Sequence, residues 1–177
     1  MPVGAFGEAS SEPFFLVCTN GKRDACCALR GRAVMTALGD AYPGRVWECT
    51  HLGGHRFAGN LVCLPDGLVY GRVDAGEAPR LAAAYRAGRV DARFLRGRSG
   101  WPAPAQVAEA ELRARLGVDG IDDVTLESID GDASRATVVL AAGGASHALE
   151  LVAERHSPRP ISCRADELEE PLHWRVT

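Results

Sequence analysis

Two cysteines and two histidines near the start of the chain have the residue types and the spacing of a metal site. Cys18 and Cys27 are separated by eight residues, and His51 and His55 by three. Thiolate and imidazole are ligands that zinc and iron–sulfur clusters prefer. The spacing therefore predicts a bound metal. By itself it fits a structural zinc site of two cysteines and two histidines as well as an iron–sulfur site.

The segment between the two histidines is expected to be a loop. Gly53 and Gly54 stand next to each other in it. Adjacent glycines make a poor helix, but they let the backbone turn tightly and approach a bulky ligand closely. His51 and His55 are therefore expected to reach the metal from a loop rather than from one face of a helix.

The cysteines are expected where a strand gives way to a helix. The apolar run 14–17 suits a buried strand that ends at Cys18, and Asp24 suits the N-cap of a helix that runs to about residue 41. Cys26 and Cys27 would lie in the first turn, where the helix dipole is expected to lower a thiol pKa. Adjacent helical residues point about 100° apart. Only one of the two cysteines can face Cys18, and the pattern leaves open which.

The other cysteines have a plainer interpretation. Cys49 lies two positions before His51, on the same side of an extended strand. Free cysteine is commonly buried, so Cys63 and Cys163 are expected to be core residues. The residues expected to lie beside the metal without binding it are Cys26, Cys49, Gly53 and Gly54.

Composition narrows the class of protein. The chain has 177 residues, of which 46% are hydrophobic and 24% charged, as in ordinary globular domains. A net charge of −3 gives no reason to expect nucleic-acid binding, and no run of about 18 apolar residues is present to cross a membrane. The N-terminus has neither the basic nor the apolar part of a signal peptide, so a cytoplasmic location is expected. There, six cysteines indicate metal or redox chemistry rather than a disulfide framework.

The order of predicted elements indicates an α/β (α+β) fold. A strand, a helix, three further strands and a second helix over about 78–87 are expected in residues 13–90, and this is the order of a thioredoxin-like layer. Residues 91–104 are expected to be a linker. Residues 105–177 are expected to form a small α+β region, with a helix to about 116 and an antiparallel meander of strands near 124–129, 136–141 and 148–153.

With these residues in view, the chain resembles the sucrase/ferredoxin-like family, a thioredoxin-like group of [2Fe–2S] ferredoxins. The resemblance rests on VCTNGKRDACC at 17–27, WECTHLGGHRF at 47–57 and LPDGLVYG at 64–71, with weaker likeness at 161–164 and 173–174. Family members usually carry a longer N-terminal portion, so a short form is expected here. The resemblance implies a [2Fe–2S] cluster bound by Cys18, Cys27, His51 and His55, with Cys27 as the ligand in place of Cys26.

The resemblance also implies a one-electron carrier whose partner is a redox protein, either a reductase or an electron acceptor. Cys18 and Cys27 are then expected on the inner iron, and His51 and His55 on the outer one. Neutral imidazoles in place of thiolates raise the reduction potential. Each ligating imidazole also keeps one ring N–H, so electron uptake is expected to be coupled to proton uptake. The oligomeric state, a homodimer included, stays open.

Two other functions compete with this interpretation. One is the structural zinc domain, which the spacing fits equally well. The other is a thioredoxin-like thiol–disulfide enzyme, against which the chain has no C-x-x-C motif. No convincing pair of carboxylates indicates sugar hydrolysis. An electron-transfer protein is therefore expected rather than an enzyme with a substrate of its own.

Overall fold

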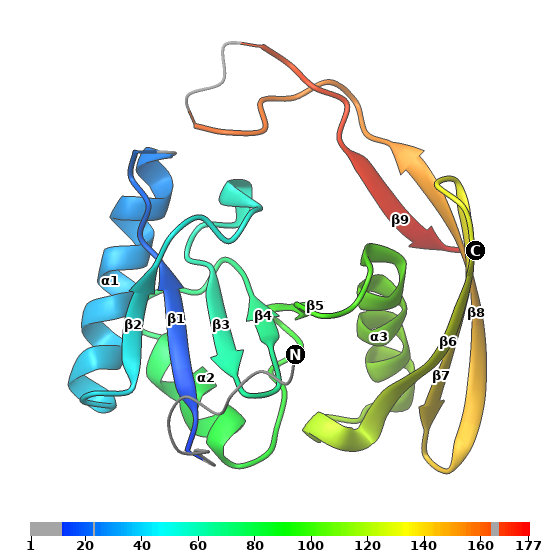
Figure 1. Cartoon of the computed structure of the whole chain (residues 1–177), viewed down its shortest axis with the longest axis horizontal. Helices are drawn as coiled ribbons and strands as arrows, with labels where there is room; N and C mark the ends of the chain where they lie inside the picture. Colours follow the sequence, from blue (N-terminus) through cyan, green and yellow to red (C-terminus); the bar gives the residue numbers. More distant parts are fainter. Residues whose placement is uncertain (1–11, 23, 164–166) are drawn as a thin grey trace, which may run out of the picture.

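The computed structural model describes residues 12–22, 24–163 and 167–177. The N-terminal residues 1–11 and Arg164, on which the sequence analysis drew, lie outside these ranges. The described chain forms a five-stranded sheet in the order β2-β1-β3-β4-β5 and a four-stranded sheet in the order β6-β7-β8-β9 (Figure 1). Each sheet is accompanied by helices, and each has its own hydrophobic core.

The first sheet confirms the thioredoxin-like α/β fold. Strand β1 pairs in parallel with β2 and antiparallel with β3, and the next two pairs are antiparallel. A helix connects the parallel pair, as a parallel crossover requires. The strands are β1 Phe14–Cys18, β2 Val46–Cys49, β3 Leu61–Leu64, β4 Leu68–Tyr70 and β5 Leu95–Arg98. Because β5 falls within residues 91–104, the expectation that this segment is only a linker is wrong.

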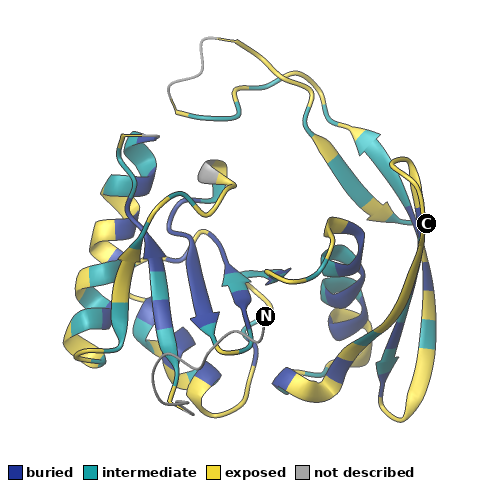
Figure 2. Ribbon diagram, in the orientation of Figure 1, coloured by how far each residue is buried: buried dark blue, intermediate teal, exposed yellow. Residues whose placement is uncertain are grey.

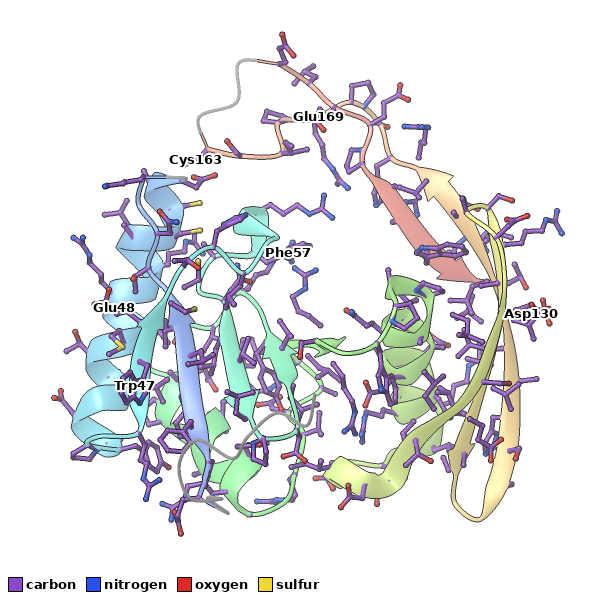
Figure 3. All side chains as sticks on the ribbon, in the orientation of Figure 1. Trp47, Glu48, Phe57, Asp130, Cys163 and Glu169 are labelled. Atoms are coloured by element: carbon purple, nitrogen blue, oxygen red, sulfur yellow. The ribbon has the colours of Figure 1, made fainter. Side chains whose placement is uncertain are left out.

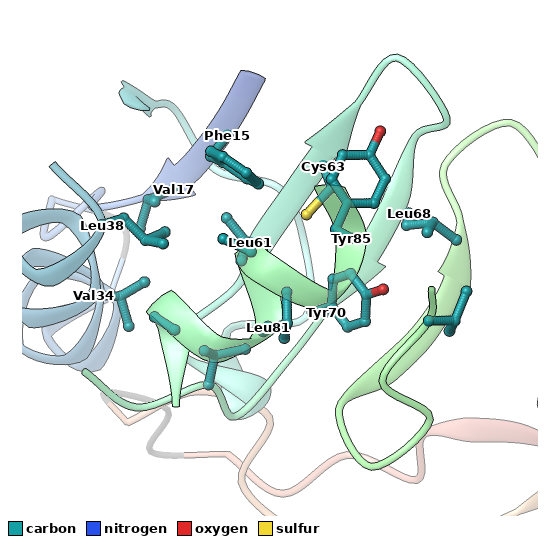
Figure 4. Packing of buried hydrophobic residues seen from close by; sticks show 14 of the residues in the cluster. Phe15, Val17, Val34, Leu38, Leu61, Cys63, Leu68, Tyr70, Leu81 and Tyr85 are labelled. Carbon is teal, nitrogen blue, oxygen red and sulfur yellow. The ribbon is translucent and has the colours of Figure 1, made fainter. Parts of the chain in front are cut away.

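Helices α1, Ala25–Ala41, and α2, Ala78–Arg86, accompany this sheet. The buried residues of α1 are Cys27, Gly31, Val34 and Leu38, which recur three or four positions apart along one helix face. Val34 and Leu38 pack with Phe15, Val17 and Leu61 of the sheet (Figure 4). Strand β3 is accordingly buried along most of its length, and β1 and β4 also contribute mainly buried residues (Figure 2). Burial of this face holds the start of α1 against the end of β1.

The second part of the chain consists of one helix and an antiparallel meander, as expected, with one additional strand. Helix α3 spans Ala103–Leu116 and ends at Gly117, whose φ of 67° is left-handed. The meander strands are β6 Val124–Gly131, β7 Arg135–Ala142 and β8 Ala145–Arg155. The C-terminal strand β9, Leu172–Val176, pairs with β8 and completes this sheet.

An ionic network joins the two parts. Glu109 of α3 is fully buried. Its Oε1 accepts one hydrogen bond from Arg98 of β5 and two from Arg113 of α3, with donor–acceptor distances of 3.1 to 3.2 Å. Arg113 is also buried and donates to the carbonyl oxygens of Gly120 and Ile121. A buried carboxylate is tolerated when cations and hydrogen bonds surround it. Arg98 therefore attaches the first sheet to the second helix-and-sheet layer.

The connection between β8 and β9 returns to the first sheet. We call residues 156–171 the tail; of these, 156–163 and 167–171 are described. The backbone N–H of Cys163 donates to Oδ2 of Asp24 at 3.2 Å, and its thiol donates to Oδ1. Asp24 is buried and stands at the start of α1. Figure 3 shows Cys163 at this end of the helix, far along the chain from its contact.

In the described part of the chain, no helix has the length and apolarity that a membrane crossing demands.

Candidate metal centre

Three of the four predicted metal ligands come together. One donor atom each from Cys18, Cys27 and His51 lie within 4.8 Å of one another. Cys18 is the last residue of β1, Cys27 is in the first turn of α1, and His51 follows β2. Three elements distant in sequence thus bring two thiols and an imidazole to one point.

A glycine in α1 makes this convergence sterically possible. A Cβ atom at Gly31 would lie 2.1 Å from the carbonyl oxygen of Cys18, far inside the closest approach of real atoms. The helix can therefore approach the end of β1 only because position 31 has no side chain. The sequence analysis did not single out Gly31. A glycine within an otherwise helical pattern, four residues after a predicted ligand, was the available signal.

The loop after His51 is built from the glycines that the sequence predicted. Gly53 and Gly54 have φ values of 79° and 61°, in the left-handed region. Their carbonyl oxygens accept hydrogen bonds from Nδ2 of Asn60 at 3.3 and 3.1 Å. Asn60 is only 2% exposed. A buried amide thus anchors the loop, and sequence reasoning missed it because a single asparagine in a loop carries no distinctive pattern.

The fourth predicted ligand, His55, begins a short 3-10 helix, His55–Phe57. Its backbone lies at the end of the anchored loop, but its side chain is outside what the structure describes. Binding of a metal by His55 therefore stays a prediction.

The structure separates the two adjacent cysteines. Cys27 is fully buried and lies with Cys18. The Cys26 thiol instead donates to Oδ1 of Asp24 at 3.1 Å. Cys27 therefore lies beside Cys18 and His51, and Cys26 beside Asp24; that Cys27 is the metal ligand stays a prediction.

Small side chains enclose the site. Cys18, Cys27 and Ala58 form a buried cluster, against which Cys26 and Cys49 pack. Cys49 stands directly opposite Cys18 in the parallel pairing of β1 and β2. The other two cysteines differ from each other. Cys63 is buried in the main core, whereas Cys163 is exposed, so the expectation that Cys163 is a core residue is wrong.

The thiols of Cys26 and Cys27 are difficult to ionise. Burial and the neighbouring Cys18 raise the pKa of Cys27 to about 11. Burial, together with hydrogen bonds to Asp24 and Cys163, raises the pKa of Cys26 to about 12. The expectation that the helix dipole lowers these pKa values is wrong, because loss of hydration outweighs the dipole. Without metal the Cys27 thiol therefore carries a proton at neutral pH, and a metal that replaces this proton would stabilise the thiolate.

The donor set fits a bound metal centre. Two buried thiols and an imidazole meet among small side chains, and these are ligands that iron–sulfur clusters and zinc both accept. The donor atoms of Cys18, Cys27 and His51 are thus of the types that bind a [2Fe–2S] cluster.

The strand order, the connecting helix and the cysteine–histidine site together define a thioredoxin-like domain with a candidate metal centre at the end of its first strand. The chain belongs to the sucrase/ferredoxin-like family, whose model matches residues 6–97.

Solved structures of thioredoxin-like [2Fe–2S] ferredoxin from Aquifex aeolicus are similar to about half of the chain. One is 17% identical, with a TM-score of 0.45, and covers 52% of this chain and 96% of its own. A cysteine-to-serine variant of that ferredoxin is 15% identical, with a TM-score of 0.43, and covers 48% of this chain and 97% of its own. No curated protein matches the chain.

Proposed function

We propose that this protein is a one-electron carrier in which Cys18, Cys27, His51 and His55 hold a [2Fe–2S] cluster. The observation that carries the proposal is the convergence of Cys18, Cys27 and His51 from three separate elements. When bound, such a cluster accepts and releases one electron. Membership of the sucrase/ferredoxin-like family supports the same class of protein.

The two sides of the site differ in exposure. Cys18 is 1% exposed and Cys27 is fully buried, whereas His51 is half-buried and the loop residues 52–54 are exposed. The cysteines therefore hold the centre from the interior. Residues 51–55, which we call the histidine loop, lie between the centre and the surface. A redox partner is accordingly proposed to dock on the histidine side, since electron exchange needs a close approach.

The histidines would set the properties of the carrier. Each neutral imidazole that replaces a thiolate removes one negative charge near the iron, which raises the reduction potential. Each imidazole also keeps a ring proton, so we propose that electron uptake is coupled to proton uptake.

Reduction potentials of histidine variants test this function. His51→Cys and His55→Cys add a thiolate, so a centre should still assemble, but at a lower potential that also loses part of its pH dependence. His147→Cys is the matched control, because His147 lies on β8 of the second sheet, where its Nε2 is 3.2 Å from the carbonyl oxygen of Ala142. Potentials unchanged in both loop variants, or absence of a one-electron couple in the wild type, would overturn the proposal.

A further inference from the structure

Three arginine side chains surround one aromatic ring next to the histidine loop. The guanidinium carbons of Arg56, Arg72 and Arg96 lie 4.8, 5.1 and 3.5 Å from the centroid of the Phe57 ring. They come from the 3-10 helix, from the segment after β4 and from β5. Figure 3 labels Phe57 on the side of the first sheet that faces the tail. Guanidinium groups stack favourably on aromatic faces, so the ring collects three positive charges.

These charges lack the acidic partners that other arginines have. Among the described residues, none of the three lies within 4.0 Å of a carboxylate oxygen, whereas Arg80 and Arg93 both pair with Glu77. A fourth cation, Arg159 of the tail, is near enough to help lower the pKa of Arg56. Its Nε is buried and has no hydrogen-bond partner in the described chain. In a protein of net charge −3, these four cations converge without an ion-paired carboxylate among the described residues, which favours a bound anion as their counter-charge.

Arg96 is held in place rather than free to turn into solvent. A Cβ atom at Gly71 would lie 2.6 Å from its Cδ, and one at Gly54 would lie 3.1 Å from its guanidinium nitrogen. Because Gly54 and Gly71 have no side chains, the Arg96 side chain has room to lie against the Phe57 ring. Burial and repulsion by Arg56 and Arg72 lower the pKa of Arg96 to about 10, so it keeps its charge at neutral pH. A fixed cation needs no reorganisation to bind an anion.

Two of these arginines, Arg56 and Arg96, border a cavity of about 390 Å³ between the histidine loop and the tail. Arg56, Arg96 and Phe57 line one side, and Ile161, Pro171 and Leu172 line the other. Glu169 is the one carboxylate in the lining, and no ion pair links it to these arginines in the described chain. Cavities of roughly 300–1,000 Å³ are typical of small-molecule sites.

We propose that this cavity binds the phosphate group of a small molecule, with Arg56 and Arg96 as its ligands and Arg72, on the same aromatic ring, adding positive charge beside them. A phosphate presents three acceptor oxygens and up to two negative charges, and the fork of a guanidinium can bind it through two parallel hydrogen bonds. A single carboxylate has two oxygens and one negative charge, so it would leave part of the positive charge of the arginines uncompensated. Gly54 lines the same cavity, so the bound phosphate lies beside the histidine loop. The site does not depend on the proposed electron transfer.

Calorimetric titration of the purified full-length protein with inorganic pyrophosphate at low ionic strength tests the site. Wild-type protein should bind one equivalent saturably, and Arg96→Gln should weaken binding at least tenfold. Arg80→Gln, which removes an equal charge from an exposed arginine paired with Glu77, should bind as the wild type does. If Arg96→Gln fails to fold, the double variant Arg56→Gln/Arg72→Gln decides, because both side chains are exposed.

Citrate, a multiply charged carboxylate, separates the two anion chemistries in the same titration. Pyrophosphate should bind more tightly than citrate. Citrate binding as tightly or more tightly would overturn the assignment to phosphate. No saturable binding of pyrophosphate, or equal binding by the wild type and the double variant, would overturn the site itself.

Discussion

The carbonyl oxygen of Cys18 and the α-carbon of Gly31 are in such close contact that a Cβ atom at position 31 would lie 2.1 Å from that oxygen. This contact sets how near helix α1 can come to the end of β1. Since Cys18 and Cys27 lie on those two elements, it also sets the separation of the two thiols.

Gly31→Ala should therefore disrupt the site. The methyl group must push α1 away from Cys18, because the opposing atom is backbone and cannot turn aside. Overpacking of this kind costs about 1–3 kcal/mol, so the midpoint of chemical unfolding should fall and less iron should be retained.

Gly39→Ala is the control within the same helix, since a Cβ there meets nothing within 4 Å. It should stabilise the protein by about 0.5–1 kcal/mol, because alanine favours a helix over glycine. Equal effects of the two substitutions would show that the contact with Cys18 does not matter.

Asn60→Ala should loosen the histidine loop. The substitution removes two hydrogen bonds to the carbonyl oxygens of Gly53 and Gly54 and leaves those groups without this partner. Loss of a buried hydrogen-bond partner costs about 1–3 kcal/mol. Iron content per chain should fall along with stability. Thr137→Ala, which removes hydrogen bonds to Glu150 in the second sheet, should not lower iron content; the same loss of iron in both variants would refute a local role for Asn60.

Glu109→Gln should destabilise the attachment between the two parts of the chain. The change leaves Arg98 and the fully buried Arg113 beside a neutral amide, and breaking a buried ion pair costs about 3–5 kcal/mol. Glu111→Gln removes an exposed pair with Arg115 on the same helix, which is worth about 0.3–0.5 kcal/mol. Thermal or denaturant unfolding measures both, and a similar small loss in each would contradict the structural role given to Glu109.

Metal-free protein should have unreactive thiols at Cys26 and Cys27. Burial raises their pKa values to about 12 and about 11, so the thiolate fraction at pH 7 is far below that of a free cysteine. Alkylation by iodoacetamide should be at least about tenfold slower than for free cysteine and should rise with pH to at least pH 10. Site-resolved mass spectrometry measures the two rates. Fast alkylation with a plateau near pH 7 would favour the thiol–disulfide enzyme instead.

Sequence patterns predicted the thioredoxin-like layer well because its elements have strong local signals. The run that ends at Cys18 is buried at Phe15, Val17 and Cys18, and the start and end of α1 agree with the predicted helix. Strand β9 and the return of Cys163 to Asp24 were missed, since both depend on pairing between segments distant in sequence.

The candidate site could be predicted in its residue types but not in its support. The spacing of the cysteines and histidines predicts a metal site. Gly31 and Asn60 support that site through tertiary contacts, which leave no pattern in the sequence. The thiol pKa values were predicted in the wrong direction, because the helix dipole is visible in a sequence and the loss of hydration is not.

Iron and labile sulfide per chain, measured in the wild type and in Cys26→Ser and Cys27→Ser, test the central claim most directly. The account predicts roughly two irons and two sulfides per chain with a red-brown colour, retained in Cys26→Ser and lost in Cys27→Ser, because only Cys27 faces Cys18. A colourless wild-type protein with one zinc and no sulfide would contradict it.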